Sequence, residues 1–270
     1  MSNRLSNHAR RAGAVLFAAL AASCATDTSS AKKARPAATV PAPTPKPQPA
    51  PAPAISPQLL AKIEADFVRI PAGTLPSRYE SRGKRPETKV AAFAIGRHEV
   101  TQELWTAVTG ENPSRHRGDP QLPVTNVSWN DAQKFIERLN EAKGSRVFRL
   151  PTAREWELAC RAGAQGHVAA QSSESSLDLY SWWGRNSGSR SHPVGTRKPN
   201  AFGLFDMLGN VAEWCETAED PKAKDILRVH AGGHFLDQNL VGQDCSTTAW
   251  LAQDAREEWT GFRLARTAKD

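Results

Sequence analysis

The sequence predicts an α+β domain that is rich in ordered loops, and three observations lead to this expectation. Three segments have the spacing and end signals of short helices, whereas the candidate strands are few and short. Between residues 164 and 260 there is little periodicity but there are many Gly, Asn, Asp and Trp residues. Loops this long in a compact domain are usually functional or held by an ion.

The first 23 residues have the features of an export leader. Arginines precede a short apolar run at 12–23, which is too short to span a bilayer as a mature helix. Small residues ahead of Cys24 resemble a bacterial lipobox, whose cysteine is lipidated and becomes the N-terminus. Ala21 stands where leucine is usual, so ordinary cleavage with an unmodified Cys24 is the alternative. Ala25 after the cysteine resembles Gram-negative outer-membrane lipoproteins, facing either the periplasm or the cell surface.

Residues 25–57 are expected to form a disordered linker ahead of a domain at 58–270. They hold nine of the nineteen prolines and show no apolar period, which predicts an extended, polyproline-like tether. Residues 1–57 also hold seven basic residues and one acid, which leaves 28 basic and 27 acidic residues for the domain. The high pI therefore belongs to the N-terminal segment, and the domain gives no reason to propose nucleic-acid binding.

The helices are expected at 99–110, 128–144 and 152–163. In 128–144, apolar residues recur at i, i+3, i+4 and i+7 after the candidate N-cap Ser128. Residues 152–163 begin with a Thr–Glu capping pair and end at Gly163. Four short strands are expected, at 67–70, 90–95, 148–150 and 261–266.

Seven sequence blocks appear in an order that identifies a family. They are FVRIPAGT (67–74), HEVTQELW (98–105), NPSR (112–115), PVTNVSWNDAQKF (123–135), RLPTAREWELACRAG (149–163), HPVGTRKPNAFGLFDMLGNVAEWC (192–215) and GFRLAR (261–266). Together they resemble the formylglycine-generating enzyme, or sulfatase-modifying factor, family. The resemblance implies a formylglycine-generating-enzyme fold, which is a loop-rich variant of the C-type-lectin-like fold with bound calcium.

The resemblance also implies calcium ligands. The family binds calcium with the arrangement D-x-x-G-x-V-x-E, which Asp206, Gly209, Val211 and Glu213 match. Carboxylate and carbonyl oxygens are the ligands that Ca²⁺ prefers. Asn186 matches the first ligand of a second family site, whose acidic ligand is missing here. The alternative is a loop whose acids cap helices or pair with arginine.

The catalytic residues that the resemblance implies are incomplete. The family oxidase uses two cysteines five positions apart, after an RGGS strand, to bind Cu(I), which soft thiolates select. Here the corresponding strand is HAGGHF at 230–235, with His234 in place of the serine. Downstream only Cys245 remains, and the position five further on is Trp250.

Three cysteines follow Cys24 in a chain whose leader permits disulfides. The resemblance suggests that Cys160 is a free thiol on an apolar helix face, because its usual family partner is replaced by Leu264. We then expect a disulfide between Cys215 and Cys245. Sequence spacing does not fix the connectivity.

Two sharper alternatives use the histidines of the same stretch. Cys245 and His234 could form a nucleophile and base. His230 and His234, spaced H-x₃-H, could bind a metal ion together with Cys245.

Two functions therefore stand against each other. The first is an envelope-anchored lipoprotein whose calcium-stabilised domain is a binding or structural module for a protein, peptide or glycan. The second is a copper- and O₂-dependent oxidase that converts a cysteine of a client protein to formylglycine or a related product. The missing second cysteine favours the first, because function is argued from the site and not from the fold. The candidate surface aromatics are Trp182, Trp183, Trp250 and Trp259.

Overall fold

The computed structural model describes most of the predicted domain. It describes residues 53–80, 83–163, 174–216, 227–239 and 242–267. The leader, Cys24 and nearly all of the expected linker lie outside the described residues.

Five helices lie in the part of the chain that the structure describes. They are α1 (Pro57–Ala65), α2 (Gln102–Thr109), α3 (Trp129–Lys143), α4 (Ala153–Arg161) and α5 (Glu174–Leu177). Helices α2, α3 and α4 confirm the three expected segments, and α1 and the one-turn α5 are additional. The first helix starts at the last residue of the expected linker, where Ser56 caps it by accepting a hydrogen bond from the Leu59 amide.

Local chemistry explains where the two best-predicted helices begin. In α3 the Ser128 hydroxyl accepts from the Asp131 amide, and the Asp131 carboxylate accepts from the Ser128 amide. In α4 Thr152 and Glu155 make the same reciprocal pair. Each reciprocal pair is a capping box. It provides hydrogen-bond acceptors for two backbone amides that have no partner within the helix, and so it fixes the first residue of the helix.

The strands form two four-stranded sheets and two short ribbons. One sheet has the order β1 (Phe67–Ile70), β6 (Phe93–Gly96), β12 (Ala265–Thr267), β7 (Phe148–Arg149). The other has the order β10 (Thr248–Ala252), β9 (Leu227–Ala231), β8 (Ala212–Trp214), β11 (Thr260–Gly261). The ribbons pair β2 (Gly73–Leu75) with β5 (Thr88–Val90), and β3 (Arg78–Glu80) with β4 (Gly83–Arg85). The strands expected at 90–95 and 261–266 are each divided between two elements.

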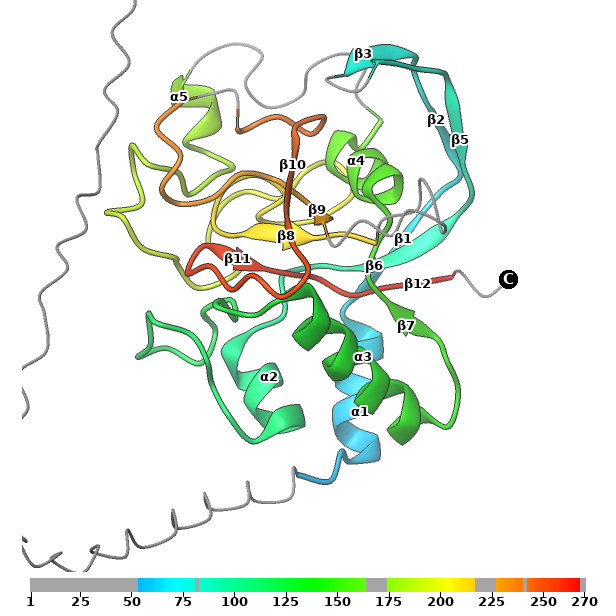
Figure 1. The fold of residues 1–270 in the computed structure, drawn as a ribbon, viewed down its shortest axis with the longest axis vertical. Helices are drawn as coiled ribbons and strands as arrows, with labels where there is room; N and C mark the ends of the chain where they lie inside the picture. The colour runs from blue at the N-terminus through cyan, green and yellow to red at the C-terminus, as the bar shows by residue number, and fades with distance from the viewer. Residues whose placement is uncertain (1–52, 81–82, 164–173, 217–226, 240–241, 268–270) are drawn as a thin grey trace, which may run out of the picture. The chain divides into compact units, whose positions relative to one another are not determined.

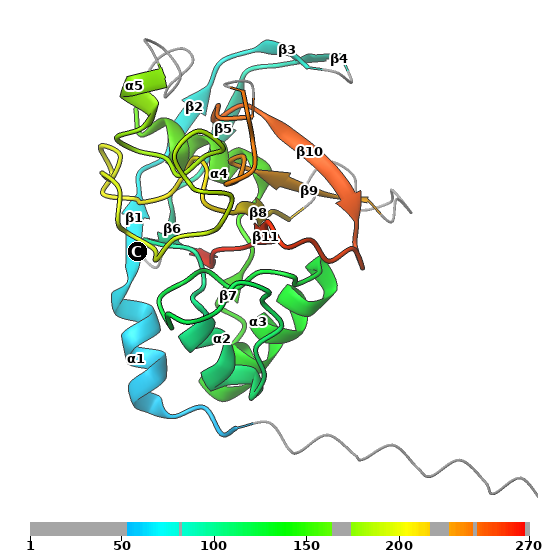
Figure 2. The same cartoon turned by 90° about the vertical axis from the view of Figure 1, so that its left-hand side faces the viewer.

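The first sheet separates two groups of elements. Figures 1 and 2 show α1, α2 and α3 on one side of it, and α4 with β8, β9 and β10 on the other. Each side has its own apolar cluster. The cluster below the sheet centres on Trp105, which stacks on Phe135 with ring centroids 5.1 Å apart. The cluster above it surrounds the fully buried Trp156 of α4.

Candidate functional site

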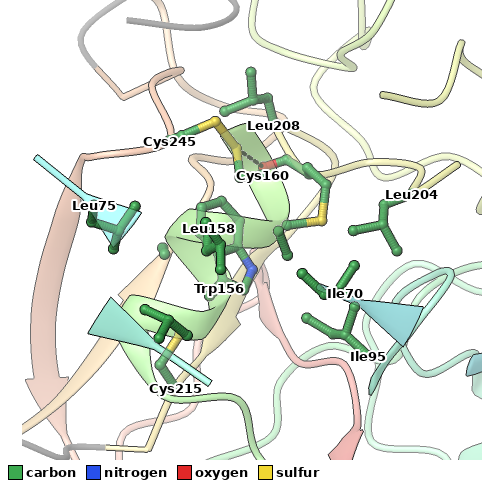
Figure 3. Packing of buried hydrophobic residues seen from close by; sticks show 14 of the residues in the cluster. Ile70, Leu75, Ile95, Trp156, Leu158, Cys160, Leu204, Leu208, Cys215 and Cys245 are labelled. Carbon is green, nitrogen blue, oxygen red and sulfur yellow. Dashed lines mark hydrogen bonds between the residues drawn. A yellow bond between two sulfur atoms is a disulfide. The ribbon is translucent and has the colours of Figure 1, made fainter. Parts of the chain in front are cut away.

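A disulfide joins Cys160, in α4, to Cys245, in the loop before β10. The two Cα atoms lie 5.5 Å apart, a normal separation for a disulfide. The prediction of a Cys215–Cys245 disulfide is therefore wrong, and so is the expectation that Cys160 is free. Figure 3 shows the reason, because Cys160 and Cys245 lie on one side of Trp156 and Cys215 lies on the other.

Cys215 is the free cysteine among the described residues, and it is completely buried. Its Sγ donates a hydrogen bond to the Glu213 carbonyl at 3.6 Å. Burial, with the charge of Glu213 as the next cause, raises the pKa of the thiol well above its ordinary value. A protonated thiol without solvent access is neither a nucleophile nor a metal ligand. The described residues therefore offer no thiolate.

The segment predicted as one strand at 230–235 is a strand followed by a sharp turn. Strand β9 ends at Ala231, and Gly232 and Gly233 both have positive φ, at 98° and 69°. A Cβ on Gly232 would lie 3.0 Å from the ring of Trp156, so the turn has no room for a side chain there. The turn carries His234 out of the sheet into the loop.

His234 is held inside this loop by both of its ring nitrogens. Its Nδ1 accepts a hydrogen bond from the Leu236 amide at 3.2 Å, and its Nε2 lies 3.3 Å from Asp237 Oδ1. The ring also stacks on Trp259, with centroids 4.4 Å apart. With neither nitrogen available to a substrate, and with Cys245 in a disulfide, the Cys–His nucleophile pair is wrong. The His₂Cys metal site is wrong for the same reason at Cys245.

The loop brings together two other positions that are five residues apart. Asp237 Oδ2 accepts hydrogen bonds from the His234 amide at 2.9 Å and from the Gln243 side chain at 3.2 Å. A Cβ on Gly242 would lie 2.7 Å from the same oxygen. Asp237 and Gly242 are thus one pair of neighbouring positions in this loop that are five residues apart, and neither can bind Cu(I) through sulfur.

His230 lies behind this loop, in β9. It is buried edge-on between Trp214 and Trp259, at centroid distances of 6.1 and 5.4 Å. Burial, and then the neighbouring His234, lower the pKa of His230 to about 4. His230 is therefore neutral at neutral pH.

A buried ion pair lies below the loop and uses one of the predicted calcium ligands. Arg263 and Glu213 are both fully buried, and two guanidinium nitrogens of Arg263 donate to the two carboxylate oxygens of Glu213 at 2.6 Å each. Trp156 Nε1 donates to one of these oxygens at 2.7 Å. Arg263 also donates to the Phe205 carbonyl at 3.0 Å and the Gly96 carbonyl at 3.2 Å. Both oxygens of Glu213 are thus occupied within the protein.

Two more buried acids surround this ion pair. Asp206 Oδ2 accepts from the Gly195 amide at 2.7 Å, and Glu99 Oε1 accepts from Asn210 Nδ2 at 3.0 Å. The other oxygens, Asp206 Oδ1 and Glu99 Oε2, are buried without a hydrogen bond to a described residue. Burial raises the pKa of both carboxyl groups, and the raise is large for Glu99. The positive charge of Arg263 therefore acts on three buried carboxyl groups, those of Glu213, Asp206 and Glu99.

The side chains among the predicted calcium ligands have different surroundings. The predicted ligands are Asp206, Gly209, Val211, Glu213 and, for the second site, Asn186. The ion pair with Arg263 occupies Glu213. The side chain of Asn186 accepts from the Trp183 amide at 2.9 Å and donates to Asp178 at 3.0 Å. Among the residues that the structure describes, no three His, Cys, Asp or Glu side chains are arranged to hold a metal ion. Among the predicted ligand side chains, Asp206 has an oxygen, Oδ1, without a hydrogen bond to a described residue.

The four candidate surface tryptophans differ in exposure. Trp183 is buried, while Trp182, Trp250 and Trp259 are half-buried. Trp182 lies between loops, stacked with His192 at 3.7 Å and with the Arg197 guanidinium 3.5 Å from its ring centroid. The surface aromatics are thus already engaged by neighbouring side chains.

Comparison with known proteins settles the family. The sulfatase-modifying factor enzyme 1-like domain matches residues 53–268. This chain belongs to that family. The matched residues include the helix caps, the Gly-Gly turn and the Arg263–Glu213 ion pair.

The curated relatives include proteins named as enzymes and proteins named otherwise. The chaperone protein LppX of Paenibacillus barcinonensis is 28% identical, over 64% of this chain and 80% of its own. The inactive C-alpha-formylglycine-generating enzyme 2 of Mus musculus is 32% identical, over 63% of this chain and 56% of its own. A formylglycine-generating enzyme of Streptomyces coelicolor is 36% identical, over 56% of this chain and 54% of its own. The chain thus spans little more than half of the last two relatives.

A solved structure confirms the fold. The Treponema denticola variable protein 1 superposes with a TM-score of 0.67 at 28% identity, over 75% of this chain and 95% of that one. The α+β, loop-rich fold predicted for the sulfatase-modifying factor family is therefore confirmed. In the described part of the chain, no helix has the length and apolar character needed to cross a membrane.

The disulfide gives a first prediction. Cys245→Ser should lower the free energy of unfolding by about 2–5 kcal/mol, because the Cys160–Cys245 bond restrains the unfolded chain over a separation of 85 residues. Urea unfolding of the unreduced protein measures the change, with Cys215→Ala as the matched control, expected to cost about 1 kcal/mol. A proteolytic digest of the unreduced chain that links Cys215 to Cys245 would contradict the assignment.

His230 gives a prediction for pH dependence. Its folded pKa of about 4 lies below the ordinary 6.5, so the unfolded chain takes up the proton more readily than the folded one. Stability from this group is complete above pH 6.5 and is lost as the pH falls towards 4, by about 3 kcal/mol in all. His230→Phe should flatten this part of the stability curve. An equal loss between pH 6.5 and 4 in both proteins would show that another group is responsible.

Proposed function

We propose that this chain is a non-catalytic binding or structural module of the sulfatase-modifying factor family, anchored in the cell envelope. The observation that carries the proposal is the state of the cysteines. Cys245 is bonded to Cys160, and Cys215 is a buried thiol. In the loop after the Gly-Gly turn, Asp237 and Gly242 lie close together five residues apart, and neither carries sulfur.

This arrangement opposes copper chemistry in two ways. Soft thiolate sulfur selects Cu(I), whereas a carboxylate is a hard ligand and glycine has no ligand atom. In addition, Asp237 is used to hold the loop, because its carboxylate receives the His234 amide and the Gln243 side chain. The residues present thus do not fit a copper centre, and no reaction step follows from one.

The names of the relatives support a role in binding another protein. The Paenibacillus relative is named a chaperone, and the mouse relative is named inactive. We propose that the partner is an exported protein or peptide, with a glycan as the alternative. The lipobox-like leader supports lipidation of Cys24 and an outer-membrane position, with residues 25–57 as the tether.

Cu(I) titration of the unreduced protein, in which the Cys160–Cys245 disulfide is intact, tests the absence of the copper centre. The wild-type chain should not bind Cu(I) against a chromophoric competitor, and it should not consume O₂ with a cysteine-containing peptide. The double variant Asp237→Cys/Gly242→Cys places two thiols where the loop brings those positions together, and it should gain binding of one Cu(I). Tight one-to-one binding by the wild type that is lost in Cys245→Ser would show that Cys245 binds copper, and it would refute the proposal.

Calcium remains part of the proposal in a reduced form. The support is Asp206 Oδ1, a buried oxygen with no hydrogen-bond partner among the described residues, in a region with more acids than cations. Glu213 does not fit the predicted ligand role because Arg263 neutralises it.

Thermal unfolding tests the calcium proposal. One millimolar CaCl₂ should raise the midpoint relative to EGTA for the wild type, because a ligand of the folded state stabilises it by mass action. Asp206→Asn should remove most of the difference, whereas Asp254→Asn, at an exposed acid elsewhere, should retain it. Equal midpoints in calcium and EGTA for the wild-type protein would rule calcium out.

A further inference from the structure

The exposed apolar side chains of the domain are unevenly distributed. Among the described residues, three large apolar side chains are exposed: Leu179 at 46%, Tyr180 at 39% and Leu227 at 37%. The first two are adjacent, directly after α5, and both line the same groove. Isolated exposed apolar residues are ordinary, whereas an adjacent pair that lines a groove makes that groove a candidate interaction site.

The groove has an apolar floor. Its volume is about 420 Å³, and its wall includes Leu204, Met207 and Leu208. The Cys160–Cys245 disulfide forms another part of the lining, and Figure 3 shows Leu208 beside it. A covalent crosslink and well-packed leucines make this floor rigid, so a ligand would find the groove already formed.

The charged residues that line the groove are Lys198, Arg161, which is paired with Glu157, and the buried Asp206. The backbone amide of Lys198 donates to the Leu179 carbonyl at 2.9 Å. Lys198 ends the stretch 185–198, which contains four Lys or Arg residues and no acid. Arg185 is paired with Glu174 and Asp178, whereas Lys198 is exposed. The exposed charge at the groove is therefore the ammonium group of Lys198, which an acidic residue of a partner would face.

We propose that this groove binds an acidic peptide segment of a partner protein, with an aromatic or aliphatic side chain inserted between Leu179, Tyr180 and Leu208. The inserted side chain supplies the buried apolar contact, and acidic residues beside it face Lys198. The exposed pair Leu179 and Tyr180 extends the contact beyond the cavity. An apolar surface that continues outside the cavity favours a peptide lying across the rim. A lipid tail would contact only the cavity.

This inference rests on the proposed function, since it gives the binding module a surface and a partner chemistry. It makes no use of the His234 loop. The peptide-binding proposal and the proposed function can therefore fail separately.

Selection from a random dodecapeptide library displayed on phage, with the full chain as bait, tests the proposal. Enriched peptides should share an aromatic or aliphatic residue flanked by Asp or Glu. Synthetic copies should bind about tenfold or more weakly to Leu179→Ser/Tyr180→Ser, and about threefold or more weakly to Lys198→Glu. Leu227→Ser, which removes an equally exposed side chain elsewhere, should bind like the wild type. All substituted side chains are exposed, and unchanged thermal midpoints confirm that the variants fold.

Three results would overturn the assignment. Enrichment of no peptide, or of peptides without a surplus of acids, would remove the chemical argument. Peptides that bind the double variant normally but lose binding in Trp259→Ala would move the binding site to the His234 loop and leave the proposed function intact. Stoichiometric binding of dodecanoate that requires Leu179 and Tyr180, without peptide enrichment, would assign the groove to an anionic lipid instead.

Discussion

The buried pair of Arg263 and Glu213 is the interaction on which the rest of this structure depends. Arg263 lies between β11 and β12, Glu213 lies in β8, and Trp156 of α4 donates to the same carboxylate. The pair therefore joins the two sheets to α4. Removing one partner would leave a buried charge uncompensated, at a cost of about 3–5 kcal/mol. Because both groups are fully desolvated, each of their hydrogen bonds must be made within the protein.

The loop above this pair shows how a scaffold can be kept while its chemistry changes. The Gly-Gly turn, the disulfide and the aromatic contacts of His230 and His234 position the loop without a reactive group. Asp237 illustrates the difference. Its carboxylate is an internal hydrogen-bond acceptor that holds the loop together.

The parts of the fold that could be predicted from sequence depend on contacts a few residues apart. The capping boxes of α3 and α4 are visible in sequence because both partners lie within four residues. Helix α1 was missed because its Pro57 was read as the end of a proline-rich linker, although proline at the first position favours a helix. The resemblance to a family supplied the overall fold, which short-range patterns could not.

The candidate site was harder to predict because its contacts are distant in sequence. Cys160 pairs with Cys245 across 85 residues, and Glu213 with Arg263 across 50. From the D-x-x-G-x-V-x-E pattern alone, Glu213 is predicted to bind calcium. The sequence does not show that Arg263 lies beside it in the fold. Likewise, the engagement of both nitrogens of His234 depends on the turn that Gly232 and Gly233 impose.

The crosslink between α4 and the loop before β10 has a consequence for damage to the chain. It encloses the residues between Cys160 and Cys245, which include β8 and β9 and the Glu213 half of the ion pair. A protease that cuts the backbone once within this span leaves two pieces that remain covalently joined. Under oxidising conditions the Cys160–Cys245 disulfide would therefore hold a nicked domain together. Reduction of that bond would release the two pieces.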